Sequence, residues 1–285
     1  MNDDRLQLGS FTIHGLRDGF FYLDGGAMFG VVPRILWEKL APPDEKNRIK
    51  MGLNSLLISD GNTHILVDTG FGTLLKPKFY EHYGMERKPG LIEALQSEGL
   101  SVEDIDFVIN THLHFDHCGW NTRRNEAGEI VPTFPNAVYV VQKGEWDDAR
   151  NPCLRDKSSY VPESFLPLEI HGRLELVEGE QEIIPGVRVV PVPGHTSFHQ
   201  CVEVESGGGT LFFLAELVPT SAHVGLSYIM SYDLYPVETL ESKIRIFEQA
   251  IREHWIIAFD HDPVHFFGRI GKKNDKYVFL PLSSA

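Results

Sequence analysis

The sequence predicts an α/β protein made of two similar halves that face each other. Apolar runs of strand length alternate with helix-like segments along the 285 residues. Two segments, 56–70 and 202–217, share one plan of strand, glycine turn, strand and acidic residue. No low-complexity stretch or interdomain linker is visible, so we expect a single domain over residues 1–285.

The first half is expected to be mainly β. The apolar runs 53–59 and 63–68 meet at an Asp-Gly-Asn turn, which is typical of a hairpin. Residues 90–99 have helical apolar spacing and end at Gly99, a helix stop signal. The other expected elements are a strand pair at 11–23 that breaks near Asp18, strands at 107–109 and 137–142, and a helical turn at 143–150.

Two irregular segments of this half are candidates for the walls of a site. Residues 24–30 are rich in glycine and are expected to form a loop with Met28 and Phe29 at its tip. These two apolar side chains either form a flap that binds substrate or pack into the core. Residues 151–168 are rich in proline and polar side chains, and we expect them to cross the surface or to form a substrate-side wall.

The second half repeats strands and then adds the clearest helix of the chain. That helix, 236–254, begins at a proline and keeps a 3-4-3-4 spacing of apolar residues. Its predicted buried side is Val237, Leu240, Ile244, Phe247 and Ile251. The predicted strands of this half are 173–177, 187–192, a hairpin of 200–205 and 211–214, and then 255–259 and 277–282.

The strongest chemical signal is the sequence Thr-His-Leu-His-Phe-Asp-His at 111–117, directly after a buried apolar run. Imidazole and carboxylate groups are the usual ligands of zinc, iron and related metals. Because His112 and His114 are two residues apart, an extended segment directs both to the same side. Asp116 and His117 follow after a turn and can reach a second point nearby. One short loop can therefore serve two metal ions.

Three further metal-type side chains follow apolar strands in the second half. They are His195, Glu216 and His261. Functional side chains usually lie on loops at one edge of a rigid scaffold. We therefore expect these three residues and the 111–117 loop to converge at one edge of the sheets.

The sequence resembles the metallo-β-lactamase superfamily from about residue 11 to about residue 265. The matching features are 111–119, the Pro-Gly-His-Thr at 193–196, Glu216, the Asp-His at 260–261, Asn54 and the Leu-Val-Asp-Thr-Gly at 66–70. The resemblance implies an αβ/βα four-layer sandwich of two mixed β-sheets flanked by helices. It does not specify a substrate, because the superfamily includes several classes of hydrolase as well as nucleases and oxidoreductases.

The resemblance also implies a role for each site residue. One metal ion is assigned to His112, His114 and His195, and a second to Asp116, His117 and His261. Glu216 is expected to bridge both ions, although the family normally has aspartate at this position. Asp68 is expected to hold the metal loop in place. His199 and His223 either contact substrate or are surface or packing histidines.

The predicted function is a metal-dependent hydrolase of a small ester-like substrate: a lactone, a thioester or a phosphoester. Two divalent ions, zinc first with iron or manganese as alternatives, are expected to hold a shared hydroxide that attacks the substrate. Asp116 is the predicted catalytic residue, since it can orient the hydroxide or accept its proton.

Three other functions stay open. They are a nuclease of the same fold, a di-iron oxidoreductase and a metal-binding sensor without turnover. A nuclease needs a basic groove, and the oxidoreductases usually lack the second histidine of the loop and work with a flavin domain. Lactonases of the family often have a tyrosine shortly after the bridging acid, whereas Leu-Val-Pro-Thr occupies 217–220 here, which weighs against a lactone.

Composition indicates which partners and which cellular location to expect. The formal net charge of −14 makes nucleic acid and anionic membranes poor partners, so we expect a small-molecule substrate. The three scattered cysteines suggest no disulfide framework. Residues 1–5 are polar without an apolar signal core, and no run reaches membrane-spanning length, so a cytoplasmic location is expected. The oligomeric state is left open.

Overall fold

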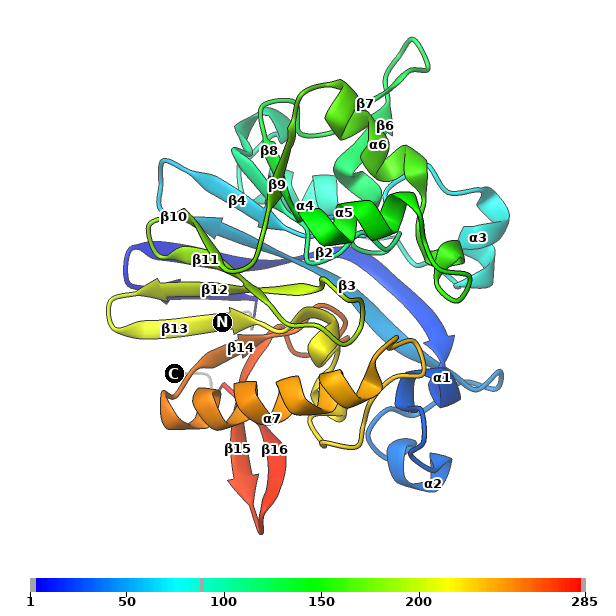
Figure 1. Cartoon of the computed structure of the whole chain (residues 1–285), viewed down its shortest axis with the longest axis vertical. Helices are drawn as coiled ribbons and strands as arrows, with labels where there is room; N and C mark the ends of the chain where they lie inside the picture. Colours follow the sequence, from blue (N-terminus) through cyan, green and yellow to red (C-terminus); the bar gives the residue numbers. More distant parts are fainter. Residues whose placement is uncertain (1–3, 88–89, 283–285) are drawn as a thin grey trace.

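The first half of the chain forms a mixed sheet of seven strands, coloured from blue to green in Figure 1. The computed structural model describes residues 4–87 and 90–282, so Met1, Asn2 and Asp3 of the polar start lie outside it. Antiparallel pairs join the first four strands in the sheet order, and parallel pairs join the last four. In that order the strands are β1 (Arg5–Leu8), β2 (Phe11–Asp24), β3 (Arg48–Ser59), β4 (His64–Val67), β5 (Phe107–Ile109), β8 (Val138–Gln142) and β9 (Leu174–Val177).

The second half forms another seven-stranded sheet, in which neighbouring strands also follow chain order. Only one of its strand pairs is parallel, the pair formed by the fourth and fifth strands. The strands are β10 (Gln181–Ile184), β11 (Val187–Pro191), β12 (Gln200–Ser206), β13 (Gly209–Phe213), β14 (Ile256–Ala258), β15 (Phe267–Lys273) and β16 (Lys276–Pro281). A separate two-stranded ribbon consists of β6 (Thr122–Arg124) and β7 (Ile130–Pro132).

Helices cover the outer faces of the two sheets. In Figure 1 the longest helix lies below the second sheet, and other helices lie on the upper side of the molecule, near the first sheet. The helices are α1 (Gly25–Phe29), α2 (Arg34–Trp37), α3 (Pro77–His82), α4 (Leu91–Ser97), α5 (Lys143–Arg150), α6 (Pro162–Ile170) and α7 (Pro236–Arg252). Short 3-10 helices are η1 (Val102–Asp104), η2 (Gly119–Asn121), η3 (Lys157–Ser159), η4 (Ala215–Leu217) and η5 (Ser221–His223).

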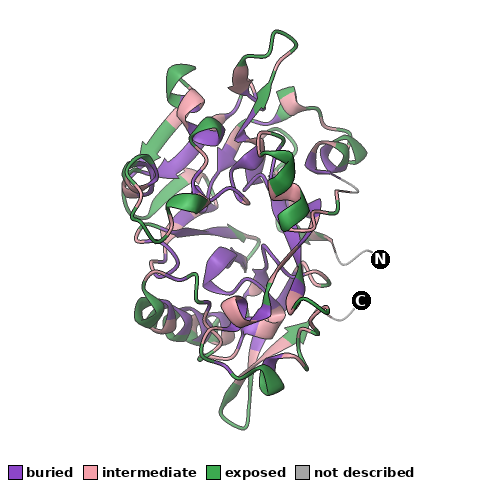
Figure 2. Ribbon diagram, turned by 90° about the vertical axis from the view of Figure 1, so that its right-hand side faces the viewer, coloured by how far each residue is buried: buried purple, intermediate pink, exposed green. Residues whose placement is uncertain are grey.

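Alternation along the strands divides the core into layers. Because successive side chains of a strand point to opposite faces, Leu56 joins the core between the two sheets and Leu57 joins the core beside α4. Likewise Leu211 faces the first sheet and Phe212 packs with α7. The buried colour in Figure 2 accordingly fills the middle of the molecule, and exposed colour lies on the outward sides of the helices. The predicted αβ/βα sandwich is confirmed.

The predicted internal repeat brings two acidic residues to matching places. The hairpin of β3 and β4 corresponds to that of β12 and β13, and each hairpin is followed across its sheet by a parallel strand, β5 or β14. Asp68 follows the end of β4, and Glu216 follows the end of β13. The backbone turns through the left-handed region at both strand ends, with φ of 55° at Asp68 and 45° at Ala215. Both ends therefore deliver side chains to the same edge.

The break predicted near Asp18 is a bulge and not a turn. Instead of a strand pair at 11–23, the structure has the single strand β2, whose pairing with β3 shifts register between Arg17 and Phe20. Gly19 has a φ of 105°, which side-chain-bearing residues rarely adopt. A bulge bends a strand and redirects a side chain, and here Asp18 becomes buried.

The predicted loop at 24–30 is also corrected, because it contains the short helix α1. The side chain of Asp24 caps this helix by accepting a hydrogen bond from the backbone N–H of Ala27. As a result Met28 and Phe29 are not at an exposed tip, and both are buried. The glycines that suggested a loop lie in the first turn and just past the end of the helix.

Helix α7 is present as predicted, but a different face of it is buried. Val237 is 67% exposed and Ile244 is 41% exposed, although both belong to the predicted apolar stripe. The first half of the helix instead turns polar side chains inward. The buried residues of the whole helix are Thr239, Ser242, Lys243, Ile246, Phe247 and Ala250.

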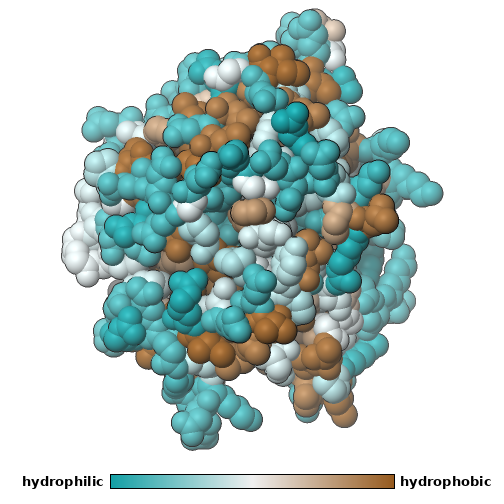
Figure 3. Space-filling view, viewed as in Figure 1, coloured by the Kyte–Doolittle hydropathy of each residue, from teal (hydrophilic) through white to brown (hydrophobic). Residues whose placement is uncertain are grey.

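The outer surface in the view of Figure 3 is mainly hydrophilic, with scattered hydrophobic patches. Exposed apolar residues spread singly over a surface are normal for a folded chain. Within residues 4–87 and 90–282, no helix combines the length and the apolar composition needed to cross a bilayer.

We expect Asp18→Ala to destabilise the fold by about 3 kcal/mol or more, because it removes the acceptor of three buried donors. The Asp18 carboxylate accepts hydrogen bonds from Phe71 N, Leu91 N and Trp120 Nε1. Urea unfolding measures the change, and Asp147→Ala on the exposed side of α5 is the control, expected within about 0.5 kcal/mol of wild type. Equal stability of the two variants would contradict the anchoring role of Asp18.

Candidate metal centre

Loops from both sheets bring the seven predicted metal ligands together at one edge. The loop after β5 carries four of them, and the segments after β11, β13 and β14 carry one each. They form two groups, and within each group the candidate ligand atoms lie within 4.8 Å of one another. The first group is His112, His114 and His195, and the second is Asp116, His117, Glu216 and His261.

The three histidines of the first group direct ring nitrogens at a common point. His195 Nε2 and His114 Nδ1 lie 3.1 Å apart. His112 Nδ1 lies 3.0 Å from the hydroxyl of Thr111, whereas its Nε2 is buried and has no hydrogen-bond partner among the residues that the structure describes. Buried nitrogens left free in this way are what a shared cation requires.

The second group surrounds the carboxylate of Glu216. Its Oε1 lies 2.9 Å from His261 Nε2 and 3.4 Å from His117 Nε2, and its Oε2 is buried without a hydrogen-bond partner. Asp116 is close to the same two rings, at 3.9 Å from His117 and 3.7 Å from His261. The longer side chain of glutamate therefore still points into the site. These distances group Glu216 with the second set of ligands.

Asp68 fixes both ends of the histidine-rich loop. Its Oδ1 accepts a hydrogen bond from Thr111 N at 2.8 Å, and its Oδ2 accepts from Thr111 Oγ1 at 2.8 Å and from His117 Nδ1 at 2.9 Å. The hydrogen bond to His117 Nδ1 leaves Nε2 of that ring to face the site. This arrangement is the one expected of an acid that orients metal ligands.

Asp233 orients His195 in a similar way, although no sequence pattern indicated this role. Its Oδ1 lies 3.0 Å from His195 Nδ1, and its Oδ2 accepts from the hydroxyl of Thr239 on α7 at 3.0 Å. Asp233 lies in the long connection before α7, where a lone aspartate has no recognisable pattern. Only the folded chain shows that it directs His195 Nε2 toward the first group.

Glu145, also missed by sequence reasoning, joins the two loops of the first group. This carboxylate on α5 is fully buried. It accepts hydrogen bonds from Leu113 N at 3.0 Å, from Thr196 Oγ1 at 2.7 Å and from Tyr160 OH at 3.1 Å. Leu113 lies between two histidines of the first group and Thr196 follows the third, so Glu145 fixes the spacing between their loops.

Opposing electrostatic effects act on the histidines of the site. At His195 burial acts to lower the pKa, but the charges of Glu216 and Asp233 outweigh it and raise the pKa. Burial and then the charges of neighbouring histidines lower the pKa of His112 and of His114 well below the usual range, so both rings are in the neutral form that ligates metals. In the second group burial acts in the same direction, but nearby carboxylates outweigh it and raise the pKa of His261 to about 9. That group therefore favours added positive charge, and its residues fit a metal ion.

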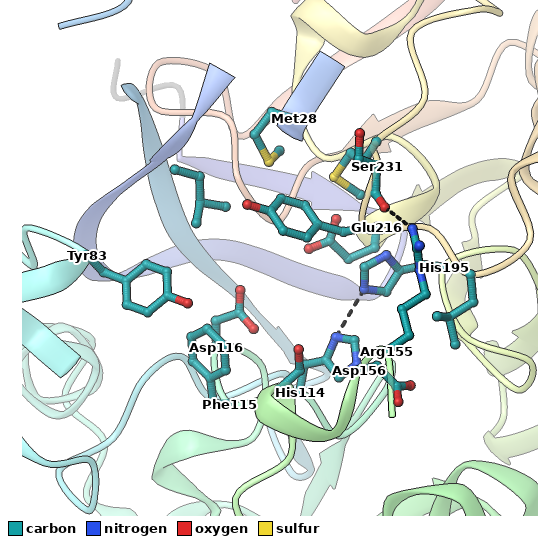
Figure 4. A pocket seen from close by; sticks show the side chains of 15 residues that line it. Met28, Tyr83, His114, Phe115, Asp116, Arg155, Asp156, His195, Glu216 and Ser231 are labelled. Atoms are coloured by element: carbon teal, nitrogen blue, oxygen red, sulfur yellow. Dashed lines mark hydrogen bonds between the residues drawn. The ribbon is translucent and has the colours of Figure 1, made fainter. Parts of the chain in front are cut away.

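A pocket of about 420 Å³ opens over both groups. In Figure 4, Asp116 and Tyr83 lie on one side of it, Glu216 and His195 on the other, and Met28 at its upper end. Residues 155–159 of the predicted surface excursion contribute Arg155, Asp156 and Ser159 to its wall. Apolar side chains cover much of the remaining wall. These are Leu23, Met28, Phe115, Met230 and Leu234.

Three predicted substrate-binding residues lie inside the protein and not in the wall of this pocket. Phe29 is stacked on Trp37 and on His223, which corrects its expected position at a loop tip. His223 Nε2 lies 3.0 Å from the backbone oxygen of Met28. His199 Nδ1 lies 3.0 Å from a backbone oxygen beneath the first group. Of the predicted pair at 28–29, only Met28 reaches the pocket.

Comparison with known proteins agrees with this geometry. An N-acyl homoserine lactonase of Bacillus thuringiensis is 28% identical over 212 residues, which cover 70% of this chain and 76% of the relative. A probable metal-dependent hydrolase of Staphylococcus aureus is 30% identical, with a TM-score of 0.89 over 98% of this chain and 100% of that one. The dizinc quorum-quenching lactonase AidC, solved with a product, has the same fold at 20% identity and a TM-score of 0.82, over 99% and 98% of the two chains.

The family model that matches the chain covers residues 50–261, a span that includes every residue of both groups. The fold, the histidine-rich loop and the later ligands thus agree with one another. The chain belongs to the metallo-beta-lactamase superfamily and is a metal-dependent hydrolase.

Proposed function

We propose that the protein hydrolyses lactones that carry an apolar substituent. The observation that carries this proposal is a pocket in which two groups of metal-type ligands lie beside a wall of apolar side chains. The lactonase relative in Bacillus thuringiensis and the lactonase fold of AidC give further support. A pocket of this size, with an apolar wall beside the polar groups that fix orientation, suits a compact substrate with an apolar part.

Two divalent metal ions, zinc in this proposal, would be held by the first and second groups. When bound, such ions polarise a carbonyl oxygen and lower the pKa of water. The histidines serve as neutral donors, while Asp116 and Glu216 balance part of the positive charge. Asp68, Asp233 and Glu145 keep these donors oriented, so little rearrangement is needed when substrate enters.

Asp116 is the proposed proton carrier. Its carboxylate borders the pocket and is close to both rings of the second group. It accepts a proton from the attacking water and returns it to the ring oxygen that leaves the carbonyl carbon. Water is thereby added across the ester bond, and one open-chain hydroxy acid is formed, which releases a proton to solvent to become the carboxylate.

Two tyrosines in the pocket are proposed to bind the substrate. Burial, and then the charges of nearby groups, raise the pKa of Tyr83 and of Tyr232 to about 12, so both phenols keep their protons at neutral pH. Each can donate a hydrogen bond to an ester or amide oxygen. The sequence lacks a tyrosine directly after Glu216, but these two tyrosines reach the same pocket from other segments. That absence is therefore weaker evidence against a lactone than the sequence alone suggested.

The proposal predicts that the zinc-loaded protein hydrolyses N-acyl homoserine lactones with kcat/KM at least about tenfold above that for thioesters and phosphoesters of similar size. The Asp116→Asn variant should stay folded and lose roughly 10²- to 10⁴-fold in kcat, as for a lost general base. Elemental analysis of both proteins controls for metal loss. A preference for a thioester or phosphoester over every lactone tested would overturn the proposed substrate.

Glu216→Gln should lose metal sharply, whereas Glu216→Asp should retain it. Residues that merely orient a ligand contribute about 10- to 100-fold to metal affinity, so removal of a ligating charge should cost at least as much. Titration of the apoprotein with zinc measures both affinities and the number of ions bound. Equal metal content and turnover in Glu216→Gln and wild type would remove Glu216 from the site.

Met28→Ala should change substrate selectivity, whereas Phe29→Ala should reduce stability. Met28→Ala enlarges the pocket and should change the preference for long over short acyl chains by roughly tenfold. Phe29→Ala empties a core position and should cost about 3–5 kcal/mol of stability, with little change in that preference. Chain-length profiles and thermal melts of the two variants test this pair. A selectivity change in Phe29→Ala alone would contradict the assignment of the pocket wall.

A further inference from the structure

We propose that Lys243 on α7 holds the apolar wall of the catalytic pocket in place and thereby tunes substrate selectivity. The role rests on the function proposed above. Lys243 is fully buried, on the helix face where the sequence predicted no inward residue at that position. Lysine is almost never fully buried unless its ammonium group has partners, so its surroundings require an explanation.

The partners of Lys243 are three backbone oxygens of a single loop. Nζ donates to His223 O at 2.7 Å, to Tyr228 O at 2.9 Å and to Gly225 O at 3.0 Å. The three N–H donors of the ammonium group are therefore all used. Within residues 4–87 and 90–282, no carboxylate forms an ion pair with Lys243. All three hydrogen bonds of Lys243 therefore stabilise the conformation of residues 223–228.

This loop is joined to α1, the helix that carries Met28. His223 Nε2 lies 3.0 Å from Met28 O, and the His223 ring stacks on Phe29 with ring centroids 4.3 Å apart. Ser231 N donates to Ala27 O at 2.8 Å. At Gly30, whose φ is 55°, an added Cβ would lie 2.4 Å from the backbone oxygen of Ile229, so the segment directly after residues 223–228 is in close contact with the end of α1.

The joined segments make up one side of the pocket. Figure 4 shows Met28 and Ser231 close together at the end of the cavity away from Asp116. Met230, Tyr232 and Leu234 of the same connection also line the pocket. A shift of residues 223–228 would therefore move the surface against which an acyl substituent packs.

The same face of α7 supports His195 through a different residue, Thr239. Thr239 donates to Asp233, which in turn orients His195. The hydrogen bonds of Lys243 go to neither Asp233 nor His195, although its charge and that of Asp233 attract each other. Loss of Lys243 should thus disturb the wall and leave the first group of ligands intact. A change in the pocket wall without a change in the first group of ligands would distinguish a positioning role from a general structural one.

The principal test compares Lys243→Met with wild type. Methionine fills a similar volume and removes the three donors. For long-chain lactones we expect KM to rise roughly tenfold, because a displaced wall binds the substituent less well. For short-chain lactones kcat should stay within about threefold of wild type, and metal content should be unchanged. Ile13→Val, in the core between the sheets, is the control for reduced stability.

A second measurement needs no substrate. In Lys243→Met, hydrogen exchange should become roughly tenfold faster at amides of 223–231 and of α1, while amides of 111–117 keep their protection. Absence of lactone turnover by wild type would overturn the proposed function, and the exchange measurement would still decide whether Lys243 holds the wall.

If Lys243→Met does not fold, His223→Phe decides the question. Phenylalanine keeps the stack on Phe29 and loses the hydrogen bond to Met28 O, so a shift in chain-length preference is expected in the same direction. A lower melting temperature of Lys243→Met with unchanged selectivity and exchange overturns the inference. So does wild-type selectivity in His223→Phe.

Discussion

A carboxylate buried at the end of β4 is the constraint on which the metal centre depends. Asp68 has almost no contact with water, and it accepts hydrogen bonds from the first and last residues of the 111–117 loop. A buried charge is costly unless such donors surround it. The loop must therefore keep one conformation, and that conformation directs four candidate ligands to one edge.

Each half of the protein supplies what the other lacks. The first half provides the ligand-rich loop together with Asp68 and Glu145, and the second provides His195, Glu216 and Asp233. Glu145 accepts from both sides of this division, since Leu113 belongs to the first half and Thr196 to the second. The apolar surface between the sheets brings the halves together, and these polar contacts fix their register at the site. The arrangement of the candidate ligands is thus a property of the joint between the halves.

Local patterns made part of this structure predictable. The histidine-rich loop, the hairpin of β3 and β4 and the existence of α7 all follow from spacing within a few residues. Strands such as β1, β10 and β15 were missed, because they are short or polar and form only through pairing. The inward face of α7 could not be predicted either, because Thr239 and Lys243 are buried where they donate hydrogen bonds to the irregular connection before the helix. Asp233 and Glu145 likewise acquire their roles only through tertiary contact.

The order of the candidate ligands along the chain has a consequence for biosynthesis. The loop at 111–117 is synthesised long before Glu216 and His261, which complete the second group. Until β14 has been made and docked, the nascent chain offers an incomplete set of donors that any ion with affinity for imidazole or carboxylate could occupy. On the proposed function, a full complement of ions would therefore mark a finished molecule. A cell that supplies metal late in synthesis favours correct loading over mismetallation.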